Sequence, residues 1–62
     1  MGLEDYVGKT GVASTKLRPA GTALIESTRV DVVTTGDFIE KETEIVVVRV
    51  DGNRIVVEEK KK

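Results

Sequence analysis

The fold is decided by one stretch near the C-terminus, Ile45-Val46-Val47-Val48-Arg49-Val50-Asp51-Gly52-Asn53-Arg54-Ile55-Val56-Val57. Two valine-rich runs flank Asp51-Gly52, a favoured central pair of two-residue hairpin turns because glycine adopts the positive φ that such turns require. The stretch therefore predicts an antiparallel hairpin with strands at residues 44–50 and 54–58. Residues 45–48 are apolar on both faces, so the first strand is expected to lie centrally in a sheet or to curl across two layers of packing.

The rest of the chain continues this β pattern. It contains 11 Val, 4 Ile and 7 Thr but only 3 Ala and 3 Leu, and β-branched side chains favour pleated surfaces over helices. No stretch of helical length repeats its apolar positions at helical spacing. Glycines and Pro19 divide the chain into short segments. We therefore expect three further strands, at residues 9–15, 21–26 and 29–34, with a turn at 17–21 and a longer connection at 35–43.

The five expected strands belong to one small domain. Five strands in about 50 residues are too few for two packed sheets, whereas a closed barrel buries one face and removes most of the open sheet edge. We predict an all-β fold, a small five-stranded barrel of the OB type, over residues 8–58. Residues 1–7 are expected to form a flexible N-terminal segment, and residues 59–62 a charged C-terminal tail.

Composition excludes several classes of function. The chain has no cysteine and no histidine, and 10 basic against 11 acidic side chains give a formal net charge of −1. Thiol enzymes and Cys/His metal sites are therefore excluded, and the near-neutral charge argues against a general polyanion binder. No apolar run approaches the roughly 20 residues that cross a bilayer as a helix. We expect no cofactor and no bound metal.

Candidates for catalysis are few. Without histidine or cysteine, nucleophilic catalysis would need a serine with a lysine base, and Ser14 and Lys16 share one face of their expected strand. A lysine base must be desolvated, whereas two polar side chains on one strand face more often form a solvated surface. Gly8-Lys9-Thr10 matches the end of a phosphate-binding loop, but Leu3 stands where that loop needs glycine, and a strand follows instead of a helix. We expect no enzymatic activity.

Acidic residues alternate along one segment. Glu40, Glu42 and Glu44 would form one row on an extended chain. We interpret this row as a charged edge that opposes aggregation, because oxygen-rich metal loops carry a tighter pattern of Asp, Asn and Gly.

Binding of single-stranded nucleic acid is the alternative function for such a barrel. Small OB barrels bind single strands with aromatic stacking platforms in a basic groove. Here the only aromatic residues are Phe38 and Tyr6, and Tyr6 falls in the N-terminal segment. The basic residues that would line one face, with acidic residues close by, are Arg29, Arg49 and Arg54.

Phe38-Ile39 is the most informative apolar pair. Adjacent residues on an extended segment point in opposite directions, so one of the two would face outward unless both plug an open end of the barrel. We favour the plug, because a small domain needs every large apolar group in its core. The sharper hypothesis is a contact patch for a protein partner. Its expected members are Leu17, Arg18, Pro19, Phe38 and Ile39.

Several stretches resemble the C-terminal soluble domain of NfeD-like proteins. Residues 8–21, Gly-Lys-Thr-Gly-Val-Ala-Ser-Thr-Lys-Leu-Arg-Pro-Ala-Gly, resemble that family's Gly-x-x-Gly, small-residue strand and Leu-Arg-Pro-Ser/Ala-Gly. Residues 29–33, the segment Gly-Asp-Phe-Ile-Glu-Lys at 36–41 and the closing run at 45–57 are also similar. The family usually has glycine where this chain has Thr28 and Glu42. Because such a glycine commonly supplies a positive φ, the resemblance leaves turn geometry near these two positions open.

The resemblance implies a five-stranded OB-like barrel and a non-catalytic function. Members of the family are membrane proteins in which this domain follows transmembrane helices, and long forms carry an upstream serine-protease domain that supplies no catalytic residue here. They are encoded beside stomatin-, flotillin- or prohibitin-like membrane proteins, with which the domain is thought to interact. The resemblance therefore implies a soluble, cytoplasm-facing interaction module that meets the membrane only through its parent protein. A weak homo-oligomer would add avidity.

Overall fold

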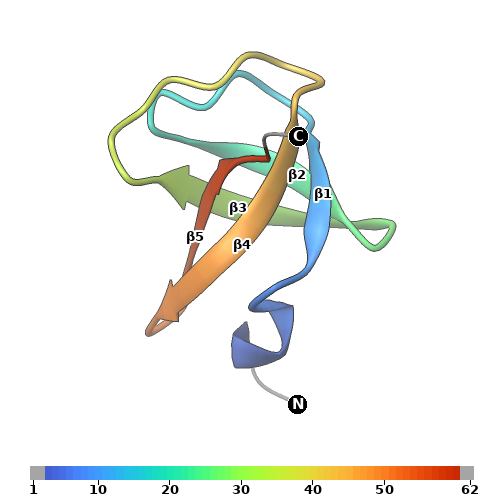
Figure 1. The fold of residues 1–62 in the computed structure, drawn as a ribbon, viewed down its shortest axis with the longest axis vertical. Coiled ribbons are helices and arrows are strands. Elements are labelled where there is room, and N and C mark those ends of the chain that lie inside the picture. The colour runs from blue at the N-terminus through green and yellow to red at the C-terminus, as the bar shows by residue number, and fades with distance from the viewer. Residues whose placement is uncertain (1–2, 61–62) are drawn as a thin grey trace.

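Five strands follow one another in the order that the sequence predicts (Figure 1). The computed structural model describes residues 3–60, which begin with a single turn of 3-10 helix, η1. Every predicted strand is confirmed, with ends that differ by at most two residues. The bounds are η1 Leu3–Tyr6, β1 Thr10–Ala13, β2 Ala20–Ile25, β3 Thr28–Thr34, β4 Glu44–Asp51 and β5 Arg54–Glu59.

The strands close into a barrel in the order β1-β2-β3-β5-β4. Antiparallel pairs join β1 to β2, β2 to β3, β4 to β5 and β1 to β4. The remaining contact is parallel, between residues 32–34 of β3 and 55–57 of β5. The predicted all-β, five-stranded barrel is therefore confirmed.

Strand β4 lies between two neighbours, β1 and β5, as its apolar sequence predicts. Its alternation is interrupted by a β-bulge between Val47 and Arg49. The extra residue lets Val47 enter the core while Val50, three positions later, also packs against it. Val48 is left 37% exposed. The continuous valine run thus reflects a bulge as well as burial.

The β4–β5 turn is centred one residue later than the sequence predicts. Asp51 pairs with Arg54, so the central residues are Gly52 and Asn53. Of these two, only Gly52 has a positive φ, at 63°, which is the pattern of a type II′ turn with glycine first. The expected Asp51-Gly52 centre is therefore wrong by one position.

Two other turns place residues other than glycine at positive φ. The β2–β3 hairpin turns on Glu26 and Ser27, with φ of 51° and 66°. Thr28 itself is the first residue of β3, so the strain lies just before it. Glu42 has φ of 68°, so the turn geometry that the sequence left open at this position is left-handed. The chain reverses there, so the row expected of Glu40, Glu42 and Glu44 does not form: only Glu44 lies in a strand.

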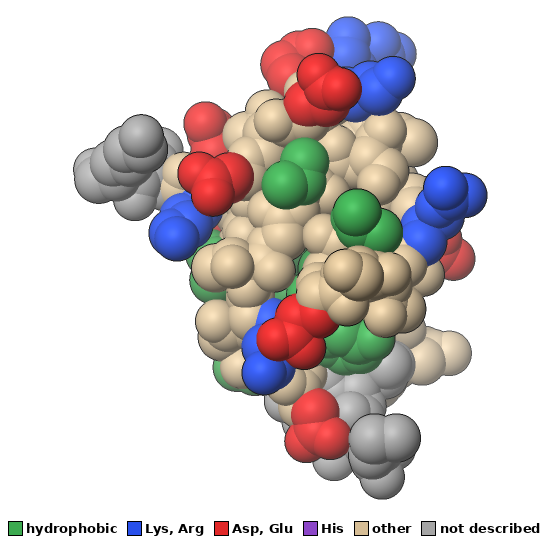
Figure 2. All heavy atoms as spheres, turned by 90° about the vertical axis from the view of Figure 1, so that its right-hand side faces the viewer, with side chains coloured by type: hydrophobic (Ala, Val, Ile, Leu, Met, Phe, Trp, Pro, Cys, Tyr) green, Lys and Arg blue, Asp and Glu red, His purple; other side chains and the backbone are tan. Residues whose placement is uncertain are grey.

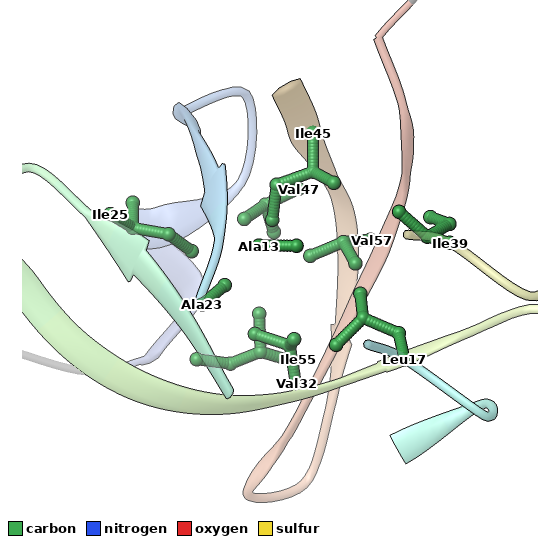
Figure 3. Packing of buried hydrophobic residues seen from close by; sticks show 10 residues of the cluster. All are labelled: Ala13, Leu17, Ala23, Ile25, Val32, Ile39, Ile45, Val47, Ile55 and Val57. Carbon is green, nitrogen blue, oxygen red and sulfur yellow. The ribbon is translucent and has the colours of Figure 1, made fainter. Parts of the chain in front are cut away.

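The interior of the barrel is a continuous apolar cluster drawn from every strand and from both long loops (Figure 3). Packing of this cluster is what holds so small a domain together, because the chain has no disulfide to supplement it. Thr34, 8% exposed, is the polar residue buried beside it. The cluster comprises Ala13, Leu17, Ala23, Ile25, Val32, Ile39, Ile45, Val47, Ile55 and Val57.

The two ends of the barrel are closed differently. At the lower end in Figure 1, η1 packs on β4, and the side chain of Tyr6 packs against the core together with Val30 and Val50. The predicted N-terminal segment thus contains this turn of helix, and residues 1–2 lie outside the described range. At the upper end, the β1–β2 and β3–β4 loops run beside each other. Glu59, predicted to begin the tail, is the last residue of β5, whereas residues 61–62 are not described.

Candidate functional site

The upper end of the barrel is formed by residues 14–19 and 35–43, which we call the loop end (Figure 1). The two loops are joined by an isolated antiparallel bridge between Leu17 and Ile39. The backbone N–H of Leu17 donates to the carbonyl of Ile39 at 2.8 Å, and the N–H of Ile39 donates back at 3.1 Å. A further N–H, from Glu42, donates to the carbonyl of Ala13 at 2.7 Å. The loops therefore have a defined conformation.

Leu17 and Ile39 belong to the core and not to the surface. Leu17 has no exposed area and Ile39 is 3% exposed; both side chains point toward the other core residues in Figure 3. The burial contradicts their expected role as contact side chains, because a side chain with almost no exposed area offers a partner almost no surface. Their role is to anchor the loops that carry the exposed residues.

Phe38 is the most exposed large apolar side chain of the described residues, at 72%. The favoured hypothesis, in which both Phe38 and Ile39 plug the barrel, is wrong for Phe38. The alternation at this pair is confirmed: Ile39 points inward, so Phe38 points outward. An isolated phenyl ring of this exposure contributes little to the core and is available for contact with another molecule.

Thr34 holds the backbone on the N-terminal side of Phe38, as the bridge at Ile39 does on its C-terminal side. Its buried hydroxyl donates to the carbonyl of Asp37 and accepts from the backbone N–H of Gly36, at 3.1 Å for the latter. Phe38 therefore stands between a hydroxyl-anchored turn and the bridged Ile39. Thr34 was not singled out from the sequence, although Thr-Thr-Gly-Asp is a composition typical of turns that a hydroxyl stabilises.

The bridge also sets which side chains surround Phe38. Arg18 directly follows Leu17 and Phe38 directly precedes Ile39, so the bridge brings these two chain positions to the same end of the barrel. The same register places Lys16 opposite Glu40, and their side chains form an exposed ion pair at 3.7 Å. Arg18 and Pro19 are exposed. Arg18, Pro19 and Phe38 are thus the expected contact residues that lie exposed on the two bridged loops.

Three carboxylates lie close to Phe38 around a surface pocket. A surface pocket of about 290 Å³ is lined by Phe38, Ile39 and three acidic residues. The ring edge and the carboxylates together offer a partner an apolar contact beside negative charge. The acidic residues are Asp37, Glu58 and Glu59.

A second, shallower depression lies on the outer face of β2 and β3, beside the β4–β5 turn. Its volume is about 500 Å³. In OB folds the face of strands 2 and 3 binds oligonucleotides and oligosaccharides, but no aromatic side chain lines it here, and Arg54 faces the groove together with Asp31. The lining residues are Ala20, Gly21, Thr22, Asp31, Val32, Val33, Asn53 and Arg54.

The three arginines proposed for nucleic acid do not form one basic groove. Arg54 lines the groove just described. Arg49 is exposed and pairs with Asp51 at 3.1 Å. Arg29 lies opposite Leu24 on the β2–β3 hairpin. No stacking platform accompanies any of them in these contacts, so the arrangement does not favour a single-strand binder.

The serine–lysine hypothesis has no support in the geometry. Strand β1 ends at Ala13, before Ser14, so the expected shared strand face does not exist. Lys16 is exposed and paired with Glu40, which leaves its ammonium solvated. Within residues 3–60, no cluster of three or more potential metal ligands is present.

A family model decides the relationship of this chain to known proteins: residues 3–59 match the NfeD-like C-terminal, partner-binding domain. The chain belongs to this family. The match covers the whole barrel, so the similarity of residues 8–21 and 36–41 reflects a shared domain.

Two individual proteins extend the comparison. The chain is 49% identical over 55 residues to membrane protein NfeD1b of Bacillus subtilis; the match covers 89% of this chain but 13% of that protein. The chain therefore spans about an eighth of this relative's length. Its fold matches the C-terminal domain of stomatin operon partner protein 1510-C from Pyrococcus horikoshii, with a TM-score of 0.91 and 25% identity, covering 100% of this chain and 98% of the other.

Residues 3–60 form the barrel of this NfeD-like domain. None of the helices in residues 3–60 has the length and hydrophobicity needed to cross a membrane.

Proposed function

We propose that this NfeD-like domain is a non-catalytic module that couples its parent membrane protein to a stomatin-, flotillin- or prohibitin-type partner through the loop end. The observation that carries the proposal is Phe38, which is 72% exposed yet held on both sides by Thr34 and by the Leu17–Ile39 bridge. An exposed aromatic side chain on a restrained backbone binds at a lower entropic cost, because little backbone freedom is lost on association.

Two comparisons support the class of partner. The family is described as partner-binding, and the P. horikoshii domain belongs to a stomatin operon partner protein. In the proposal, the domain meets the membrane through its parent protein and faces the cytoplasm. The proposal needs no cofactor and no metal.

The surroundings of Phe38 define the chemistry of the partner. The ring would enter an apolar pocket on the partner, while Asp37, Glu58 and Glu59 attract a cationic side chain next to that pocket. Arg18, on the opposite side of the ring, would favour an acidic group there. We expect a partner surface that places a basic residue, an apolar pocket and an acidic residue in sequence.

The test is a binding titration with a purified stomatin-type protein. Phe38→Ser should weaken binding about tenfold, because truncating a central aromatic anchor costs 1 kcal/mol or more. The matched control is Val7→Ser, which removes another exposed apolar side chain (48% exposed) from the segment beside η1. Equal affinities for wild type and Phe38→Ser would contradict the proposed surface, and loss of binding after nuclease treatment would contradict the proposed class of partner.

A further inference from the structure

A row of four side chains crosses the outer face of the barrel, from β3 to β4. Arg29 is paired with Leu24, Leu24 with Val12, and Val12 with Glu44. Residues paired in antiparallel register project from the same face of a sheet. Leu24 is 43% and Val12 39% exposed, and both charged residues are exposed, so this face is the outer one. We call these four residues the outer row.

The centre of the outer row is apolar and exposed. Single exposed apolar side chains are ordinary on protein surfaces, but Val12 and Leu24 are direct cross-strand neighbours, and Val46, half-buried, follows on β4. Figure 2 looks at the side of the molecule on which β1 and the β2–β3 hairpin lie in Figure 1. It shows hydrophobic side chains toward the middle of this side, with charged side chains around its margin and an acidic and a basic group just below the middle.

The charges at the two ends of the outer row have opposite sign. Among residues 3–60, neither Arg29 nor Glu44 takes part in an ion pair within the chain. A two-fold axis parallel to the strands, lying outside the barrel and over the boundary between β1 and β2, reverses the order of the row on a second copy. Arg29 of each copy then faces Glu44 of the other, and Leu24 faces Val12. The pattern is therefore complementary to itself, as an isologous interface requires.

We propose that the outer row is a homodimer surface whose occupant is a second copy of this chain. It uses none of the residues of the loop end, so a dimer formed in this way leaves Phe38 free for a partner and presents two copies of it.

Neighbouring charges do not remove this complementarity. Lys9 and Glu26 neutralise each other at 3.2 Å. Asp31 lies two residues beyond Arg29 and opposite Thr22, outside the row. Lys60 lies beyond Glu44, its backbone N–H donating to the Glu44 carbonyl. Glu58 pairs with Val46 on the same face, so it adds negative charge near Glu44.

Charge reversal tests the proposal on the 62-residue chain. Sedimentation velocity over a concentration series should show a reversible dimer that weakens with salt. Arg29→Glu alone and Glu44→Arg alone should each weaken dimerisation about tenfold, because each puts like charges opposite one another. The double variant, with both charges exchanged, should regain the wild-type affinity to within about threefold, since the pair is restored in the opposite sense.

Two further variants complete the experiment. Arg54→Glu changes the net charge as Arg29→Glu does, but it lies outside the outer row, so it should leave the dimer unchanged. Leu24→Gln should weaken the dimer without charge reversal, while thermal unfolding confirms that each variant is folded. A wild-type chain that stays monomeric up to about 1 mM, the upper end of useful weak association, would overturn the proposal. So would single reversals without effect, or a double variant no stronger than either single one.

Discussion

Neighbouring residues Phe38 and Ile39 show how one loop both contributes to the core and exposes an aromatic side chain. Ile39 is 3% exposed and Phe38 is 72% exposed, because consecutive side chains of an extended segment point in opposite directions. The backbone bridge to Leu17 fixes which of the two points inward. The inward residue stabilises the barrel, and the outward residue is left with a defined position and little role in the core.

A second residue, Glu42, lowers the stability of the fold through its backbone conformation. Its φ of 68° lies in the left-handed region, which costs a residue with a β-carbon roughly 1 kcal/mol or more. We predict that Glu42→Gly raises the free energy of unfolding by about 1 kcal/mol, measured as a higher urea midpoint. The matched control is Lys41→Gly, in the same turn but without a positive φ, which should gain no stability. A Glu42→Gly protein less stable than wild type would show that its carboxylate matters more than its backbone.

At the scale of the structural elements, the loops of this barrel form part of its core. The β1–β2 and β3–β4 connections each contribute a buried residue, Leu17 and Ile39, and their bridge closes one end of the barrel. Two hairpin turns also need residues with a positive φ. Gly52 adopts it without strain, whereas Glu26 and Ser27 carry a β-carbon and adopt it at a cost. The upper loops are therefore structural elements in their own right.

This role predicts that truncating a buried loop residue destabilises the fold much more than truncating the exposed Phe38. Ile39→Ala and Leu17→Ala should each lower the free energy of unfolding by about 2–4 kcal/mol, because each leaves a cavity in the core. Phe38→Ala should change it by less than about 0.5 kcal/mol, since the ring is exposed. Chemical denaturation of the three variants checks this. The prediction is contradicted if Phe38→Ala is as destabilising as Ile39→Ala.

At the scale of the whole molecule, the barrel is a rigid support that separates two exposed surfaces. The loop end carries Arg18, Pro19 and Phe38, while the outer row crosses the outer face of β3, β2, β1 and β4 from Arg29 to Glu44. Membership of the NfeD-like C-terminal, partner-binding family makes binding the expected use of such surfaces.

The fold was predictable because strand pattern and turn residues are local signals. Val-rich runs and glycines located all five strands, and closure followed from the small size of the chain. The site was only partly predictable, because burial at the loop end depends on a contact between residues 17 and 39, which no local pattern specifies. Sequence alternation required Phe38 and Ile39 to point apart but did not say which one entered the core. The bulge at Val47–Arg49 and the position of the last turn likewise depend on pairing between strands.

The most direct test of the central claim is to map the contact surface by NMR. Amide chemical shifts of the labelled chain would be followed while a purified stomatin-type protein is added, at a concentration low enough to keep the chain monomeric. We predict that the largest changes fall on Arg18, Asp37, Phe38 and the adjoining end of β5, with little change in the groove of β2 and β3. Changes centred on that groove, with the signals of Phe38 and its neighbours unmoved, would contradict the account.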